Sequence, residues 1–254
     1  MRKTISTFFF LLVIANGFAC SCRPIDFMQR FQFSKFVARA KIISIIEDKS
    51  DPDYSIATIQ ILELFKGSKI SSIKVSRGGC ALFINANTVW QIFALEKKGK
   101  YFAINGCSGC FEIGKKVNKD SYPTITFKHN RQLAMLKCLK SHKIQNSNPN
   151  YLEFGYDSDC FKSFKGYSLK QTFAIYEIEV SENLAVKKIK PVITFENKNL
   201  SKKIMNCMSK DLAVFNRDVK KIKKPIKLLL AFYFFPGEKG NKGDISITDF
   251  MVYK

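Results

Sequence analysis

The sequence predicts a mainly β protein in two parts, a small closed barrel with a flanking helix and then a small α+β domain. Residues 33–110 have the pattern of five or six short strands joined by hairpin turns, which is typical of a small barrel. Residues 142–152 are polar, contain an Asn-Pro pair and have the composition of a linker. Beyond them the expected order is strand, strand, helix, strand, which favours an α+β domain.

The elements of the first part follow from alternation and turn chemistry. Residues 36–43 alternate and become β-branched toward their end, and an Asp-, Ser- and Pro-rich turn separates them from the next strand. The further strands are expected at residues 54–65, 70–75, 88–95 and 100–104. Leucines at helical spacing then predict a helix at residues 128–141, which closes the first domain (residues 20–141).

The second part, residues 153–254, is expected to form a smaller sheet with one helix. Strands are predicted at residues 173–180 and 184–195, a helix opens near Asn199, and a final apolar strand covers residues 226–235. This order of elements weakly resembles the TonB carboxy-terminal type of domain of bacterial envelope proteins. The resemblance is one of pattern, without a diagnostic motif.

The chain begins with the features of an export signal. A basic pair precedes an apolar run at residues 8–15, and Gly17 and Ala19 are small residues at −3 and −1 of a cleavage site. The apolar run is shorter than the roughly 20 residues that a bilayer span needs, and no later stretch is suitable. We therefore expect residues 1–19 to be a cleaved signal peptide and the protein to be secreted or periplasmic, with no transmembrane span. The alternative is a lipoprotein signal with an acylated, lipid-anchored Cys20.

The cysteines agree with export, since all eight follow the expected cleavage point. They are Cys20, Cys22, Cys80, Cys107, Cys110, Cys138, Cys160 and Cys207. An even number in an oxidising compartment favours disulfide bonds over unpaired thiols. Cys107 and Cys110 also have metal-ligand or redox spacing, but no second such pair or nearby histidine completes a zinc set. We therefore expect disulfides and no metal site of the protein's own.

Charge and motifs exclude several function classes. The net charge is +21, and removal of Arg2 and Lys3 with the signal would leave +19. Lysine is spread almost evenly and no arginine-rich stripe or nucleic-acid motif is present, so we expect no nucleic-acid partner. No Ser-His-Asp order, phosphate loop or carboxylate pair stands out. We therefore expect no catalytic residues, no enzyme activity and no cofactor.

The mature amino terminus carries a more specific signal. "CSCRP", followed by "FQFSKFVARAKI", resembles the start of the tissue inhibitors of metalloproteinases and, more broadly, of netrin-like domains. The matching residues are Cys20, Ser21, Cys22, Pro24, Phe31, Arg39, Ala40 and Lys41. "ILELFKG" at residues 61–67 also resembles a family strand that ends in Phe-Lys-Gly. The resemblance covers residues 20–138 and implies a five-stranded OB-type barrel.

The resemblance also implies a function. In that family the two opening cysteines are tied to later strands, which implies disulfides Cys20–Cys80 and Cys22–Cys107. The free amine and the carbonyl oxygen of the first cysteine then chelate the zinc of a protease, and the next side chain enters the protease pocket. If the mechanism of that family applies to this chain, Cys20, Ser21 and Cys22 would form the inhibitory segment, and a secreted zinc metalloprotease would be the partner.

Departures from the family pattern keep a second function open. Gln32 stands where the family has a third early cysteine, and Cys110 with Cys138 is expected to supply a substitute disulfide. Cys160 and Cys207 are then expected to pair in the second domain. The alternative function is a non-inhibitory envelope or extracellular module that binds proteins or polyanions, in which the opening cysteines only fasten the amino terminus.

Overall fold

A computed structural model gives the structure of the chain. It describes residues 20–23, 25–97, 100–114, 122–148, 150–156, 164–216, 220–237, 243–247 and 249. The expected signal peptide, Pro24 and Cys160 lie outside these residues. The described residues form two compact units. None of their helices combines the length and the apolar character needed to cross a membrane.

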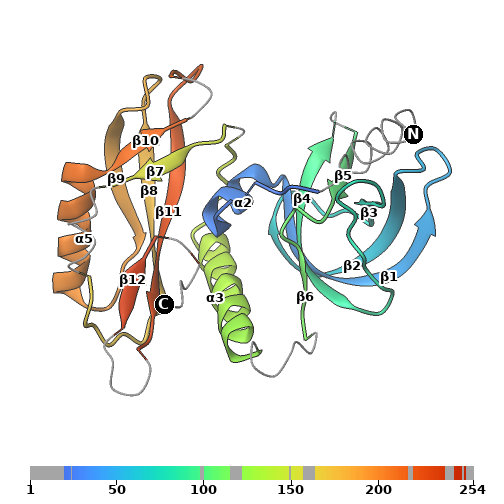
Figure 1. Ribbon diagram of the computed structural model, residues 1–254, viewed down its shortest axis with the longest axis horizontal. Helices are drawn as coiled ribbons and strands as arrows, with labels where there is room; N and C mark the ends of the chain where they lie inside the picture. The colour runs from blue at the N-terminus through green and yellow to red at the C-terminus, as the bar shows by residue number, and fades with distance from the viewer. Residues whose placement is uncertain are drawn as a thin grey trace, which may run out of the picture. The chain divides into compact units, whose positions relative to one another are not determined.

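The first unit comprises residues 20–23, Phe36–Leu64 and Ser68–Gly114. Its strands are β1 (Phe36–Glu47), β2 (Tyr54–Lys66), β3 (Ser72–Ser76), β4 (Val89–Lys97), β5 (Tyr101–Ile104) and β6 (Phe111–Glu112). The strand order is β1-β2-β3-β5-β4, and pairing of β1 with β4 closes the barrel, while the extra strand β6 pairs with β4 in antiparallel orientation (Figure 1). The β3–β5 pair is parallel, which makes the barrel mixed. The prediction of a five-stranded OB-type barrel is confirmed.

Alternation along the strands fills the barrel. Phe36, Ala38, Ala40 and Ile42 of β1 point to one face, and all four are fully buried. Alternate residues of a strand share a face, so this set lines the interior while the intervening residues lie on the other side. Several of the interior residues are alanines, because a barrel of five strands has room for few large side chains.

The second unit comprises Ile25–Lys35, Phe65–Gly67 and, from position 115 onward, the described remainder of the chain. Its elements are α2 (Phe27–Phe33), α3 (Tyr122–Ser141), β7 (Glu153–Gly155), β8 (Phe173–Val180), β9 (Val186–Ile193), α5 (Lys198–Asp211), β10 (Ala213–Phe215), β11 (Ile226–Phe235) and β12 (Asp244–Ser246). The main sheet has the order β12-β11-β8-β9, and β7 pairs with β10. The predicted order of strand, strand, helix and strand appears as β8, β9, α5 and β11, so the α+β character is confirmed.

Both faces of the main sheet are covered (Figure 1). Residues at alternate positions of β8 and β11, such as Tyr176 and Phe232, pack with Leu200 and Ile204 of α5. The opposite face contacts α3, where the Arg131 guanidinium lies 5.0 Å from the ring centroid of Tyr233. This double burial explains why β11 is a nearly continuous apolar run.

A buried polar network fixes α3 within this unit. Arg131 pairs with Asp249, and its Nη1 donates to the carbonyl oxygen of Phe234 at 3.0 Å. Gln132 Nε2 donates to the other carboxylate oxygen of Asp249 at 2.9 Å. A buried charge is tolerated only when it is paired and hydrogen-bonded, and this network meets that condition.

The helix α2 was not predicted from the sequence. Asp26 caps it, accepting from the Gln29 backbone N–H at 2.8 Å, and the Gln29 side chain accepts from the Asp26 N–H at 3.3 Å. This reciprocal capping box is the sequence signal that would have located the helix. Gln32 of α2 then donates from Nε2 to the Lys227 carbonyl at 3.2 Å and accepts from the Leu229 N–H at 3.0 Å.

The compact units differ from the expected division at residues 142–152. Both α2 and α3 belong to the second unit, although the sequence placed residues 20–141 in one domain. The segment expected to be a linker is also held by hydrogen bonds. Lys66 Nζ donates to the carbonyl of Asn146 at 2.8 Å, and the Asn148 N–H donates to the carbonyl of Gln32 at 3.2 Å.

Candidate functional site

Residues 20–23 form an exposed segment outside the helices and strands, which we call the N-terminal ridge. Two disulfides fix it to the barrel unit, Cys20–Cys80 and Cys22–Cys107, each with a Cα–Cα distance of 5.2 Å. These are the pairs that the family resemblance implies. The ridge therefore presents Ser21 on a segment that is fastened on both sides of that residue.

The two loops that hold the ridge also meet each other directly. Cys80 lies between β3 and β4, and Cys107 lies directly after β5. The Gly106 N–H donates to the Cys80 carbonyl at 2.8 Å. A Cβ at position 106 would lie 3.0 Å from the Ala81 carbonyl oxygen, so a glycine suits this close approach. Asn105 Oδ1 accepts from the Cys107 N–H at 3.0 Å, which shapes the turn.

The four cysteine sulfurs of the two disulfides form one cluster. All four Sγ atoms lie within 4.8 Å of one another. Between the disulfides, Sγ of Cys107 lies 3.5 Å from that of Cys80 and 3.8 Å from that of Cys20. The Cys20 and Cys22 sulfurs are 4.0 Å apart. We call this set of four side chains the sulfur cluster.

An apolar surface accompanies the loop that carries Cys80. Phe83 is 89% exposed, although a large aromatic side chain normally gains by burial. Phe83, Leu82 and Val75 contribute to the lining of a groove of about 390 Å³. Exposed apolar side chains next to a groove are typical of an interaction surface. This feature was not predicted from the sequence, in which its signal is the run Ala81 to Ile84 directly after Cys80.

The expected disulfide between Cys110 and Cys138 is wrong, because both are thiols in the structure. Cys110 follows β5 in the barrel unit, and the Phe93 N–H lies 3.2 Å from its Sγ. Cys138 is on α3 in the second unit, with its Sγ 3.7 Å from Nδ1 of His142. The two residues thus have separate local environments in different compact units. Cys207 is disulfide-bonded, while its predicted partner Cys160 is not among the described residues.

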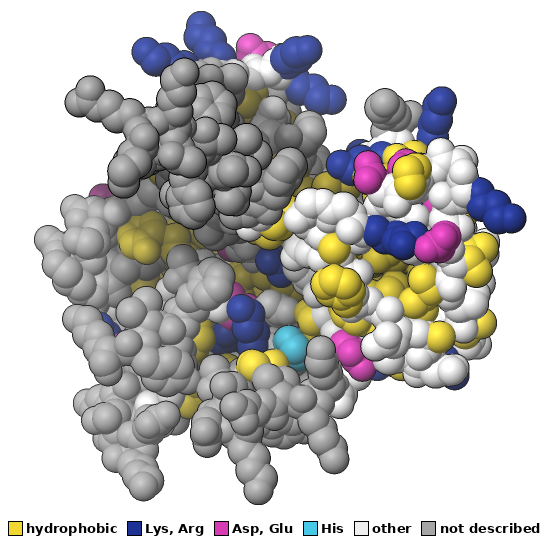
Figure 2. Space-filling model, turned by 45° about the vertical axis from the view of Figure 1, so that its right-hand side comes forward, with side chains coloured by type: hydrophobic (Ala, Val, Ile, Leu, Met, Phe, Trp, Pro, Cys, Tyr) yellow, Lys and Arg dark blue, Asp and Glu magenta, His cyan; other side chains and the backbone are white. Residues whose placement is uncertain are grey.

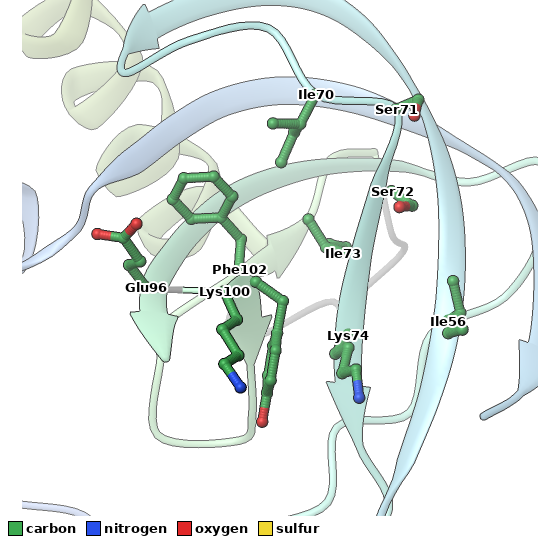
Figure 3. Close-up of a pocket in the computed structure, with 10 residues that line it drawn as sticks. Ile56, Ile70, Ser71, Ser72, Ile73, Lys74, Glu96, Lys100 and Phe102 are labelled. Carbon is green, nitrogen blue, oxygen red and sulfur yellow. The ribbon is translucent and has the colours of Figure 1, made fainter. Parts of the chain in front are cut away.

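A second groove lies on the barrel between β3 and β5 (Figure 3). Its volume is about 410 Å³, and its lining combines apolar residues with Lys74, Glu96, Lys100 and Tyr101. The Nζ of Lys74 lies 4.4 Å from the ring centroid of Tyr101. This groove was not predicted from the sequence, because its residues come from separate strands that only the barrel brings together.

Two buried ionisable residues, Asp26 and Lys66, have structural partners. Burial raises the pKa of Asp26 to about 6, and this carboxylate caps α2. Burial lowers the pKa of Lys66 to about 7, and its Nζ donates to the carbonyl of Phe31 at 2.8 Å as well as to Asn146. These contacts hold α2 and the segment after α3.

Positive side chains are scattered over the face of the molecule that Figure 2 shows. On the visible face, Lys and Arg side chains occur at several separate places and do not gather in one stripe (Figure 2). This distribution gives no particular support to a polyanion site on that face.

The chain matches no protein-family model, and it matches no curated protein.

Proposed function

We propose that the protein is an exported inhibitor of zinc metalloproteases that acts through the N-terminal ridge. The observation that carries this proposal is the exposed Cys20-Ser21-Cys22 segment, fixed by two disulfides to two different loops of a barrel. A segment that is already rigid loses little conformational entropy when it binds, which favours tight inhibition.

The chemistry of the proposal requires cleavage before Cys20. The α-amine and the carbonyl oxygen of residue 20 then become neighbouring ligands, and they occupy the open coordination position of a catalytic zinc. The amine must be neutral to bind the metal. The pKa of an α-amine is ordinarily about 7.7–8.0, so zinc competes with the proton effectively near neutral pH.

The rest of the proposed contact surface surrounds this point. Ser21 is exposed and would enter the substrate pocket of the protease next to the zinc. The Cys20–Cys80 disulfide joins the ridge to the loop that carries Phe83, whose exposed ring would extend the contact. Buried aromatic side chains often contribute strongly at protein interfaces.

The test compares a protein that starts at Cys20 with one that has a single alanine before Cys20. Inhibition constants are measured against a panel of secreted zinc endopeptidases. The added alanine converts the amine into a peptide nitrogen that cannot bind zinc, and we expect at least about a hundredfold weaker inhibition, or about 3 kcal/mol. Phe83→Ala in the native-start protein retains the amine, so a smaller loss is expected. Ser21→Gly removes only a pocket contact, and its loss is also expected to be smaller.

Circular dichroism must show the same unfolding midpoint for both starting forms. If neither form inhibits any protease in the panel, the inhibitor proposal is wrong. Equal inhibition by both forms would contradict the zinc-binding mechanism.

The second candidate is a module that binds another protein without inhibiting a protease. The groove between β3 and β5 favours it, because Tyr101, Lys74 and Glu96 provide apolar and charged contacts in one hollow. Lys100→Glu changes the charge of this groove and leaves the ridge intact. Pull-down from extracellular or envelope fractions with wild type and this variant tests the candidate, which requires a partner that the variant fails to retain.

A further inference from the structure

The sulfur cluster has the dimensions of a tetrahedral metal site. In a zinc site with four thiolates, Zn–S bonds of about 2.3 Å place the sulfurs about 3.8 Å apart. Three sulfur-to-sulfur separations between the two disulfides, Cys20 to Cys22, Cys20 to Cys107 and Cys80 to Cys107, are 4.0, 3.8 and 3.5 Å. Only the two bonded pairs would have to separate for all four sulfurs to surround one ion.

Part of this arrangement is held independently of the disulfides. The hydrogen bond from the Gly106 N–H to the Cys80 carbonyl joins the loops that carry Cys80 and Cys107. Asn105 accepts from the Cys107 N–H and fixes the turn before it. Cys20 and Cys22 are two residues apart on the exposed ridge. Two of the four ligands are thus positioned by backbone contacts, and the other two lie on the ridge, which reduction of the disulfides releases from Cys80 and Cys107.

We infer that the sulfur cluster binds one Zn²⁺ or a similar soft divalent cation when both disulfides are reduced. Each protein disulfide takes up two electrons and two protons from an external dithiol and becomes two thiols. The external dithiol is itself oxidised to a disulfide. The four resulting thiols release four protons as they bind the ion, so the site carries four thiolates. Oxidation reverses the process and releases the ion. The inference is independent of the proposed protease inhibition, which concerns the amine of the oxidised form.

Soft thiolates select zinc, and four of them form a closed structural site. In such a site the ion would replace the two disulfides in fastening the ridge to the barrel. The described part of the chain contains one group of three or more metal-type ligands with converging donor atoms, and it is this cluster. The oxidised and the metal-bound forms are therefore two alternative ways of holding the same segment.

The test uses the full mature chain under anaerobic conditions, with a phosphine reductant that avoids competition from added thiols. Bound Zn²⁺ is measured by equilibrium dialysis and elemental analysis, and Co²⁺ provides a visible absorption signature of tetrahedral thiolate binding. We expect one ion per reduced chain and none at the cluster in the oxidised chain. Zn²⁺ should also raise the melting temperature of the reduced protein.

Two double variants keep the inference falsifiable. Cys20→Ser with Cys22→Ser removes half of the ligands and should weaken binding by at least about a hundredfold. Cys110→Ser with Cys138→Ser removes two thiols outside the cluster and should retain one ion. Binding that survives the first variant, or is lost in the second, would overturn the inference. So would a reduced wild-type chain that neither binds Zn²⁺ nor is refolded by it.

Discussion

Asp48 and Lys74 show how one ion pair organises a turn of the barrel. Lys74 Nζ lies 2.5 Å from Asp48 Oδ2, and the other carboxylate oxygen accepts from the Ser50 N–H at 2.9 Å. The hydrogen bond from Lys74, followed by those from Ser50, lowers the pKa of Asp48 to about 2. The carboxylate thus joins the turn between β1 and β2 to strand β3.

The lowered pKa predicts how stability changes with pH. In the unfolded chain the Asp48 carboxyl titrates near its ordinary pKa of about 3.9, so the native state binds fewer protons between about pH 4 and 2. The stabilisation by this group is therefore complete above about pH 4 and is lost as the pH falls toward 2. Asp48→Asn should remove this contribution, so that its free energy of unfolding changes less over this range than that of the wild type.

The measurement is urea unfolding at several pH values between 2 and 5. Asp53→Asn is the matched control, because Asp53 is an exposed carboxylate of the same turn. Parallel pH curves for the wild type and Asp48→Asn would contradict the prediction.

At the scale of elements, one amide side chain of α2 attaches this helix to strand β11. Gln32 is 3% exposed, and its side chain forms one hydrogen bond as donor and one as acceptor with the backbone of β11. In the family that the sequence resembles, a cysteine occupies this position. Here the amide attaches α2 to the sheet without a covalent bond, and Cys110 and Cys138 do not supply the substitute.

We expect Gln32→Ala to lower the free energy of unfolding by about 1–3 kcal/mol. The variant leaves the Lys227 carbonyl and the Leu229 N–H without these side-chain partners in a buried region. Urea denaturation followed by circular dichroism measures the change. Gln60→Ala, at an exposed position of β2, is the matched control and should change stability by less than about 0.5 kcal/mol. Equal effects of the two substitutions would show that the contact with β11 contributes no stability.

For the whole molecule, the two described disulfides close long segments of the barrel unit. Their cysteines are 60 and 85 residues apart in the chain. In the chain-entropy model, a disulfide that closes a loop of this length lowers the conformational entropy of the unfolded chain. Each disulfide thereby stabilises the folded state by about 4 kcal/mol. The OB-type barrel thus combines a small interior with covalent fastening of its amino terminus.

Cys22→Ser with Cys107→Ser should lower the stability of the barrel by about 4 kcal/mol. Trp90 is the single tryptophan and is buried in β4, so its fluorescence reports unfolding of the barrel. Cys110→Ser with Cys138→Ser is the matched control, and it breaks no disulfide. A fall of less than about 1 kcal/mol in the first variant would mean that the disulfide does not restrain the unfolded chain as expected.

Features that arise from neighbouring residues were predictable from the sequence. Alternation identified strands β1 and β2 of the barrel, since side chains of a strand alternate between two faces, and a continuous apolar run identified β11. The leucine spacing identified most of α3, and the opening Cys-Ser-Cys motif, through its family resemblance, indicated the partners Cys80 and Cys107. The short helix α2 was missed, although its capping box is also a local signal.

The tertiary structure decided which elements pack together. Gln32 binds residues that are almost 200 positions away in the chain, and Arg131 pairs with Asp249 more than 100 positions away. Local sequence patterns do not extend over such separations along the chain. The assignment of α2 and α3 to the second unit could therefore not be derived from periodicity. For the same reason, counting cysteines could not show that Cys110 and Cys138 remain thiols. The convergence of four sulfurs at the ridge likewise follows from the parallel pairing of β3 and β5, which brings the loops after these two strands together.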